Sequence, residues 1–419
     1  WWWGIDRRPA AGEQAVAGAA QLLQQAQRPV ILVGGAAALS DCQAELVRLA
    51  ERLQIPVAQT PSGAGAMPAD HPLWLGSIGR NGTFPANQAT RSADVLLALG
   101  VRFDDRESSA WIPGYTFQIP PTRLIQVDVD EQELARNYPV HLGVQADPKM
   151  FLQQLLAWLD RDGGRDGQAD GQTSAAAAPA RRQWLGQVAA WKQEWHSYMQ
   201  QRYRPEAKPV SPQHLLRTLR RVLPRDGILA VDVGVHHNWV VQQWESYSPQ
   251  TILQSWGFAA MGFGAAGVLG AKLAAPERPA VALCGDGGFL MVSHAVATAV
   301  EYGIPVTWVV WNNFGYVSIR DLQRGAFGPR ELATMFARQE SGELFSPDFA
   351  LLARAYGAQG VRVESPGELG DALEAALRSG RPTVVDVVMD REDAPVAVGT
   401  WQLPPLPHPE PNYPGLRRA

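Results

Sequence analysis

Short runs of apolar residues alternate with helix-like segments along most of this chain, and the alternation limits the fold more than any other feature. Pro29–Val33 is one such run, and Gly34 and Gly35 follow it directly. Strands that are apolar on both faces belong to parallel sheets that helices cover on both sides. The sequence therefore predicts an α/β fold with doubly wound parallel sheets.

The expected elements fall into two blocks. The expected strands are 29–33, 56–60, 94–99 and 124–129 in the first block, and 228–233, 280–284, 305–311, 359–363 and 382–388 in the second. Residues 161–183 are rich in Gly, Asp, Gln and Ala without an apolar period, which predicts a flexible linker. We thus expect domains at 1–160 and 184–395 and a proline-rich tail at 396–419.

Composition excludes several classes of protein. Acidic residues (41) slightly outnumber Lys and Arg (37), whereas a nucleic-acid-binding protein needs a basic surface. The two cysteines, Cys42 and Cys284, are too few for a disulfide framework or a cysteine zinc site, and they fit a cytoplasmic location. Residues 251–271 are uncharged but rich in glycine and small side chains, so we expect an internal turn and helix rather than a membrane span.

Polar residues follow two expected strands of the second block. The strand at 280–284 ends in Gly285-Asp286-Gly287-Gly288, and the next strand ends in Asn312-Asn313. Because parallel strands end at one edge of the sheet, Asp286 and Asn313 are expected to lie side by side. Their oxygens suit Mg²⁺, the glycines let the backbone approach a diphosphate, and a helix beginning near Phe289 adds its dipole. The alternative is a pair of ordinary strand-end turns.

A polar loop also follows a strand of the first block. Residues 100–106 (GVRFDDR) hold two arginines and two aspartates directly after the strand at 94–99. Such a loop is either a set of ion pairs or a phosphate site, because arginine forks bind phosphate oxygens well. The residues by themselves leave both readings open.

The Gly285-Asp286-Gly287 and Asn312-Asn313 pair resembles the cofactor motif of the thiamine-diphosphate-dependent enzymes. The resemblance implies that Asp286, Asn313 and the backbone carbonyl of Gly315 bind Mg²⁺, and that Gly285, Gly287 and Gly288 lie at the diphosphate. Residues 255–264 resemble the family's segment under the thiazolium ring, which implies cofactor contacts from Ala259 and Met261. His236 falls on a diphosphate-contacting histidine. The alternatives are that Met261 is plain core and His236 a structural histidine.

Loops of the first block resemble those of the acetolactate (acetohydroxyacid) synthase catalytic subunit. In that family these loops line a structural FAD site; the alternative is that the domain keeps the loops without flavin. The residues that the resemblance places at this site are Gly34, Gly35, Thr60, Gly79, Gly82, Gly100, Val101, Arg102, Asp104, Arg106, Asp128, Asp130 and Glu133.

The resemblance implies decarboxylation of a 2-keto acid such as pyruvate and its joining to a second carbonyl, in a homodimer or tetramer, with a regulatory subunit left open. The family's N-terminal pyrimidine-binding domain, which carries its catalytic Glu, matches no part of this chain. We therefore expect a fragment with half an active site, without a catalytic residue or turnover of its own; its first residue, Trp1, is not a Met. Other thiamine-diphosphate decarboxylases or lyases, and a non-catalytic cofactor-binding remnant or regulatory partner, remain alternatives. The chain departs from the family's sequence pattern at Leu322 and at 323–345, and these departures leave the identity of the acceptor substrate open.

Overall fold

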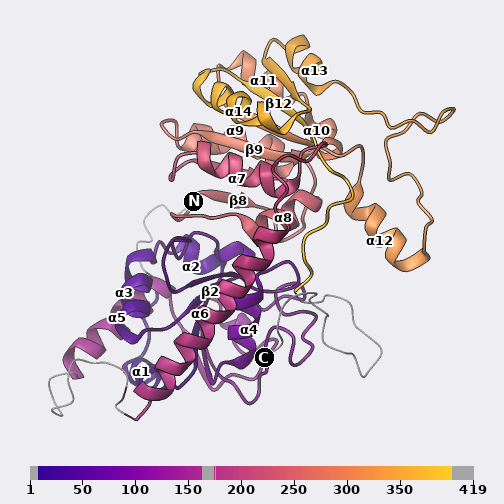
Figure 1. The fold of residues 1–419 in the computed structure, drawn as a ribbon. Coiled ribbons are helices and arrows are strands. Elements are labelled where there is room, and N and C mark those ends of the chain that lie inside the picture. The colour runs from indigo at the N-terminus through magenta and orange to yellow at the C-terminus, as the bar shows by residue number, and fades with distance from the viewer. Residues whose placement is uncertain (1–7, 163–173, 175, 399–419) are drawn as a thin grey trace. The chain divides into compact units, whose positions relative to one another are not determined.

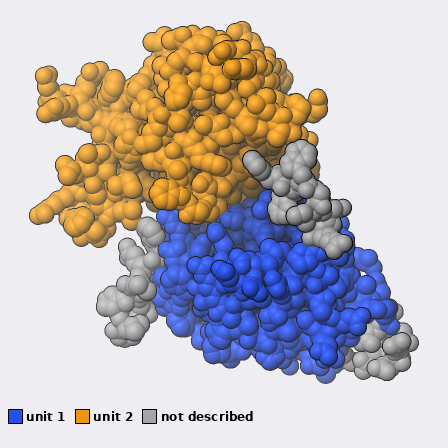
Figure 2. Space-filling model, turned by 180° about the vertical axis from the view of Figure 1, so that it is seen from behind, with its two compact units in different colours: residues 1–201, 246–249, 396–419 blue, residues 202–245, 250–395 orange. Residues whose placement is uncertain are grey.

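The computed structural model describes residues 8–162, 174 and 176–398. They belong to two compact units: unit 1 comprises residues 1–201, 246–249 and 396–419, and unit 2 comprises residues 202–245 and 250–395 (Figure 2). Each unit is built on a six-stranded, all-parallel sheet with helices on both faces (Figure 1). This confirms the predicted α/β class with two doubly wound domains. Within the described residues, no helix combines the length and the apolar character that crossing a bilayer requires.

Unit 1 has the strand order β3-β2-β1-β4-β5-β6. Its strands are β1 (Pro29–Val33), β2 (Val57–Gln59), β3 (Trp74–Ser77), β4 (Val95–Leu99), β5 (Arg123–Asp128) and β6 (Leu142–Gln145). Its helices are α1 (Glu13–Gln25), α2 (Gly35–Leu39), α3 (Gln43–Leu53), α4 (Phe84–Ser92), α5 (Pro148–Asp162) and α6 (Ala178–Gln201), with 3-10 turns at Pro61–Gly63 and Glu131–Glu133. Chain direction along the sheet reverses between β1 and β4, where such folds bind ligands beyond the strand ends.

Both faces of this sheet are buried, because successive side chains of a strand point to opposite sides. Ile31 and Val33 of β1 belong to one core, with α1, α3 and α5. Val30 and Leu32 belong to the opposite core, with α4 and α6. This double burial explains why the apolar run at 29–33 is continuous rather than alternating.

Helix α6 places the end of the first domain later than the sequence predicted. Trp184, Val188 and Trp191 are buried in the core of unit 1. Arg181 donates hydrogen bonds to the carbonyls of Leu53 (2.8 Å), Leu23 (2.6 Å) and Ala26, which lie at the carboxyl ends of α3 and α1. Helix therefore begins inside the expected linker, and unit 1 extends to residue 201 rather than 160. The linker residues 163–173 and 175 and the tail residues 399–419 lie outside the described residues.

Unit 2 has the strand order β11-β12-β10-β9-β7-β8. Its strands are β7 (Ile228–Val231), β8 (Ile252–Gln254), β9 (Ala280–Gly285), β10 (Thr307–Asn312), β11 (Gln359–Val363) and β12 (Thr383–Val388). Its helices are α7 (Pro212–Val222), α8 (Val235–Gln243), α9 (Phe263–Ala274), α10 (Asp286–Val292), α11 (Ala295–Glu301), α12 (Val317–Phe327), α13 (Phe349–Ala355) and α14 (Leu369–Arg378), with a 3-10 turn at Pro366–Glu368. The chain runs from β7 to β8 on one side and then to β9 on the other, so the topological switch lies between β7 and β9.

The sheet of unit 2 is also buried on both faces. Leu229 and Leu283 lie in the core that α7, α8 and α14 cover. Ala230 and Ala282 lie in the core that α9, α11 and α13 cover. The uncharged stretch at 251–271 divides into the short strand β8, a loop and the first part of α9, as its glycines predicted.

The sequence analysis missed three strands: β3, β6 and β8. All three lie at an edge of their sheet. All three are only three or four residues long, and β6 and β8 are also partly exposed, so none carries the continuous apolar run by which the central strands are recognised. In β8, for example, all three residues are only half-buried.

Candidate functional site

The carboxyl end of β7 carries a buried aspartate at the topological switch of unit 2. Asp232 is fully buried and accepts hydrogen bonds from the backbone N–H of Gly262 (3.0 Å) and Gly264 (3.3 Å). Burial raises its pKa, while these backbone donors lower it. Asp232 thereby fixes the start of α9 and the loop before it. The sequence analysis placed Asp232 inside a strand; one acid in an apolar run was the signal that it overlooked.

His236, in the first turn of α8, lies close to the same strand ends. It is 1% exposed, its ring hydrogen-bonds to the backbone of Asp232, and its buried Nε2 has no partner in the part of the chain that the structure describes. Burial lowers the pKa of His236 to about 4, so the ring is neutral at pH 7. An unpartnered buried nitrogen costs free energy, and a ligand that satisfies it recovers that cost.

Asp286 is a buried carboxylate without a cationic partner among the described residues. It is 1% exposed and begins α10, whereas the sequence predicted a helix start near Phe289. It accepts hydrogen bonds from the N–H of Gly287 (2.8 Å) and Gly315 (2.9 Å). Burial nevertheless raises the pKa of Asp286 to about 7. A cation bound at this carboxylate would offset the cost of its burial.

The two asparagines at the end of β10 have different surroundings. Asn312 donates hydrogen bonds to Asp386 on β12 (2.9 Å) and to Ser346 (2.9 Å). Asn313 is 3% exposed, and its side chain has no hydrogen-bond partner in the described part of the chain. Asn312 therefore joins neighbouring parts of unit 2, while the amide of Asn313 is available to a ligand. Asp386, which Arg362 also contacts at 2.8 Å, was missed from the sequence.

Packing in the folded chain requires glycine at two positions of the Gly-Asp-Gly-Gly turn, which the sequence did not reveal. A Cβ on Gly287 would lie 2.4 Å from the ring of Tyr316, and one on Gly288 would lie 2.2 Å from the Asp232 carboxylate. Both positions thus make room for neighbouring side chains. Gly285 differs, because its nearest neighbour would be the His236 ring at 3.4 Å. The expectation that Gly287 and Gly288 only admit a diphosphate is therefore incomplete.

Gly315 holds the chain in a conformation that other residues rarely adopt. Its φ is 142°, and a Cβ there would lie 2.3 Å from the carbonyl oxygen of Thr334. The N–H of Tyr316 donates to the same carbonyl at 2.7 Å, and Gly315 forms an antiparallel bridge with Met335. This packing fixes the backbone whose N–H donates to Asp286, while the role of the Gly315 carbonyl as a metal ligand stays a prediction.

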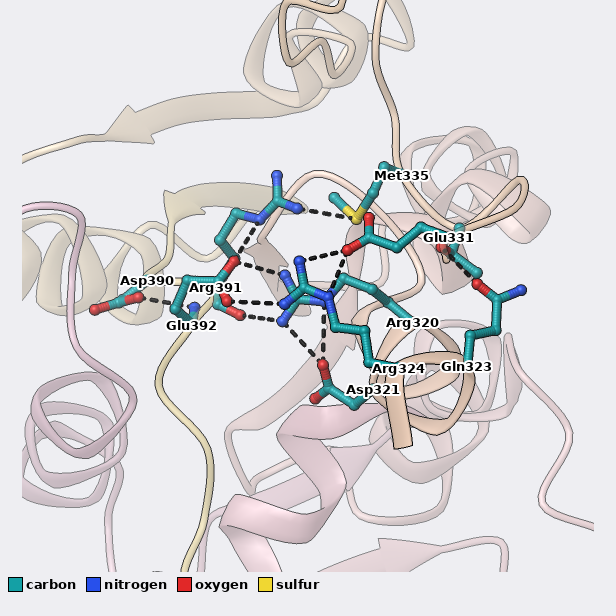
Figure 3. Close-up of polar contacts among 10 residues, drawn as sticks. Arg320, Asp321, Gln323, Arg324, Glu331, Met335, Asp390, Arg391 and Glu392 are labelled. Carbon is teal, nitrogen blue, oxygen red and sulfur yellow. Dashed lines mark hydrogen bonds and ion pairs between the residues drawn. The ribbon is translucent and has the colours of Figure 1, made fainter. Parts of the chain in front are cut away.

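An ion-pair network anchors the helix that follows this turn (Figure 3). Arg320 of α12 is 2% exposed and donates to Glu392 (2.7 Å), Asp321 (2.9 Å) and the Arg391 carbonyl (3.0 Å). Arg324 binds Glu392 as well, at 3.2 Å. The network ties α12 to the segment after β12. Leu322, at a predicted departure from the family, is 38% exposed on this helix.

The loop before α9 carries the other two residues predicted to contact the cofactor. Ala259 has a positive φ of 55°, and Met261 is half-buried. Close by, His237 hydrogen-bonds to Gln254 (2.8 Å) and stacks on Trp256, with ring centroids 4.1 Å apart. This stack was not foreseen from the sequence. It fixes the start of the loop, while the cofactor contact expected of Met261 stays a prediction.

The residues around Asp286 fit a magnesium diphosphate. Considering the described residues alone, they offer a buried carboxylate without a cation, an amide at Asn313 without a hydrogen bond and a His236 nitrogen without a partner. Oxygen ligands of this kind suit Mg²⁺, which keeps phosphate oxygens and water in its shell. No cluster of three or more His, Cys, Asp or Glu side chains suited to a metal occurs among the described residues. The metal would therefore depend on amide, carbonyl and ligand oxygens besides Asp286.

The predicted flavin residues lie at the carboxyl ends of the strands in the unit 1 sheet. They end or follow β1 (Gly34, Gly35), β2 (Thr60), β3 (Gly79, Gly82), β4 (Gly100, Val101, Arg102, Asp104, Arg106) and β5 (Asp128, Asp130, Glu133). Several of the glycines are explained by contacts between loops: a Cβ on Gly34 would lie 2.0 Å from the Gly100 oxygen, and one on Gly79 would lie 2.5 Å from the Arg106 oxygen. These glycines therefore carry no argument for a flavin.

A buried glutamate that the sequence analysis missed lies at the same end of the unit 1 sheet. Glu107 is 7% exposed, and burial together with the nearby Asp104 raises its pKa to about 8. Asp104 accepts a hydrogen bond from the Glu107 N–H at 2.9 Å. Glu107 is thus mainly protonated at neutral pH.

We expect Glu107→Gln to stabilise the chain in alkaline solution. The unfolded Glu ionises near pH 4.5 but the folded one near pH 8, so stability falls as the pH rises between these values and stays low above them. Gln keeps the neutral form, so the variant should gain on the order of 5 kcal/mol above pH 8 and nothing below pH 4.5. Urea unfolding at both pH values measures this, with the exposed Glu131→Gln as control. An equal gain at both would contradict the assignment.

Comparison with known proteins agrees with this division into units. Residues 16–155 match the family described as "Thiamine pyrophosphate enzyme, central domain", and residues 232–387 match "Thiamine pyrophosphate enzyme, C-terminal TPP binding domain". The matched ranges fall in unit 1 and, apart from residues 246–249, in unit 2. The candidate metal and diphosphate residues thus all lie within the second match.

Several curated proteins are similar to the chain. A probable acetolactate synthase large subunit of Methanocaldococcus jannaschii is 34% identical over 382 residues, which are 90% of this chain and 60% of that protein. The acetolactate synthase isozyme 3 large subunit of Escherichia coli is 30% identical over 89% of this chain and 61% of its own length. A sulfoacetaldehyde acetyltransferase of Castellaniella defragrans is 31% identical over 93% and 64%. The chain thus spans about 60% of the length of these relatives.

Proposed function

Because the chain belongs to the thiamine pyrophosphate enzymes through their central and C-terminal domains, we propose that it binds thiamine diphosphate with Mg²⁺ in unit 2 and serves an acetolactate synthase. The observation that carries the proposal is the buried Asp286 carboxylate, which has no cation among the described residues and follows β9, the neighbour of the strand β10 that Asn313 follows. The acetolactate synthase relatives support the reaction that the resemblance implies, whose substrate is a 2-keto acid such as pyruvate.

Each residue of the site has a part in this proposal. Asp286, Asn313 and the carbonyl of Gly315 would hold the metal, and Nε2 of His236 is the polar atom left for the diphosphate. Asp232 fixes the loop from which Ala259 and Met261 would contact the cofactor. When bound, thiamine diphosphate supplies the carbon nucleophile and the electron sink for decarboxylation. The residues described above bind and orient it.

The other expectations remain proposals, and the geometry of the site gives them no support of its own. A homodimer or tetramer and a regulatory subunit follow from the resemblance alone, and a cytoplasmic location follows only from the low cysteine content. FAD at the loops of unit 1 also rests on the resemblance, since packing between those loops explains several of their glycines. A second activity has a specific observation in its favour: the sulfoacetaldehyde acetyltransferase is 31% identical over 401 residues.

Product analysis of the complete gene product tests the proposal. The protein is given thiamine diphosphate, Mg²⁺ and either pyruvate or sulfoacetaldehyde, and the products are identified by mass spectrometry. We expect acetolactate from pyruvate, and none when Asp286 is replaced by Asn. Conversion of sulfoacetaldehyde without acetolactate would favour the second activity. Cofactor binding without any product would contradict the enzymatic proposal and favour a cofactor-binding remnant.

A further inference from the structure

A groove of about 450 Å³ lies at the edge of the unit 2 sheet, away from the candidate cofactor site. It is lined by Gln359 and Thr383, the first residues of β11 and β12, and by small side chains of α14. The cofactor residues follow the carboxyl ends of their strands. Because all six strands are parallel, the groove lies at the opposite end of the sheet, about 15–20 Å away along the strands. We call it the β11 groove.

Both charged residues that line the β11 groove are arginines, Arg354 and Arg381. Arg354 donates one hydrogen bond, to the Gly360 carbonyl at 2.8 Å, which fixes its guanidinium and leaves other N–H groups free. Within the described residues, the Arg381 guanidinium has no partner; only its backbone forms hydrogen bonds. Two positive charges therefore share one groove without a carboxylate in its lining.

Three acidic residues near the groove in the sequence have other partners, and the exposed Asp371 of α14 does not line it. Glu374 of α14 pairs with Arg378, while Glu364 and Asp386 both pair with Arg362. None of the three lines the groove. The positive charge of the lining thus persists in the folded unit, and an anion entering from solvent would meet unused donors.

We propose that the β11 groove binds a small oxyanion, a carboxylate or phosphate ester with a compact apolar body. Guanidinium forks match the oxygens of both groups, and such charge-assisted hydrogen bonds are among the stronger ones in proteins. Ala372, Ala375 and Ala376 leave room for a short aliphatic part, and Val361 adds an apolar wall. The site is separate from the proposed cofactor site, so it stands whether or not the chain binds thiamine diphosphate.

Calorimetric titration of the whole chain with inorganic phosphate and with butyrate tests the proposal and separates the two sources of the oxyanion. Thiamine diphosphate and Mg²⁺ are kept present so that the proposed cofactor site does not take up the probe. We expect saturable binding of at least one probe, weakened about tenfold by Arg381→Ala, since a charge-assisted hydrogen bond contributes that much. Arg381→Ala removes no contact of its guanidinium with the described residues, so folding is expected to be retained.

Two further variants make the result specific. Arg378→Ala is the matched control, because it removes the same charge from a nearby residue that does not line the groove. Ala375→Leu fills the groove and keeps both arginines, so it should weaken butyrate about tenfold while Arg378→Ala changes nothing. Absence of saturable binding for both probes, or equal weakening by Arg378→Ala and Arg381→Ala, would overturn the proposal.

Discussion

Replacing Asp286 by Asn is expected to abolish metal-dependent binding of thiamine diphosphate, with a loss of at least about 100-fold, since changes outside the ligand shell already cost 10–100-fold. Asp286 is the acidic residue of the proposed metal set, and Asn supplies no charge to offset the metal and diphosphate. Calorimetric titration with the cofactor, with and without Mg²⁺, measures the effect. Asp371→Asn, at an exposed position of α14, is the matched control.

The same variant separates a lost ligand from a lost fold. Burial raises the pKa of Asp286 from 3.8 to about 7, so without metal the folded state is destabilised as the pH rises through this range and stays so above it. Asn removes that cost, and we expect the metal-free variant to unfold at a higher temperature than the parent at pH 8. Undiminished cofactor binding by Asp286→Asn would contradict the site assignment, whatever its stability.

Gly264→Ala is expected to destabilise unit 2 by about 3 kcal/mol, the upper range for overpacking. A Cβ at Gly264 would lie 2.4 Å from the backbone nitrogen of Asp232 and 2.7 Å from the carbonyl carbon of Val231. Backbone atoms of a central strand move little, so α9 must shift away from β7. Urea unfolding monitored by tryptophan fluorescence measures the loss.

The same helix offers a matched control for this effect. A Cβ at Gly270 would meet no heavy atom within 4 Å. Gly270→Ala is therefore expected to stabilise α9 by about 0.5–1 kcal/mol, because Ala is the better helix former. If both variants shifted stability in the same direction and by the same amount, the close contact between α9 and β7 would not be the cause.

Much of the fold could be predicted because its signals are local. Strand β1 has the bounds that the sequence predicted, since the spacing of apolar residues is fixed by the chain itself. The edge strands β3, β6 and β8 gave no such signal, because they are only three or four residues long and β6 and β8 are also partly exposed. The end of the first domain was misplaced for a related reason: nothing local shows that Trp184 packs into the core of unit 1.

The candidate site shows where the sequence stops being sufficient. The spacing of Gly285-Asp286 and Asn312-Asn313 predicted that two neighbouring strand ends would carry oxygen ligands, and β9 and β10 are indeed adjacent and parallel. That Asn312 binds Asp386 while Asn313 stays free could not be predicted, because Asp386 lies 74 residues away on another strand. Asp232 escaped notice for the same reason, since its partners Gly262 and Gly264 meet it only in the folded sheet.

The sequence by itself determined the alternation of strands and helices, the α/β class and the positions where polar groups end the strands, because these depend on the local spacing of side chains. Only the tertiary structure decided which of those groups have partners. It left Asp286 without a cation among the described residues, filled the space at Gly287 with Tyr316 and left Arg381 unpaired in the β11 groove. Strand order and helix packing bring distant residues together, and the partners of a buried charge are set by those long-range contacts.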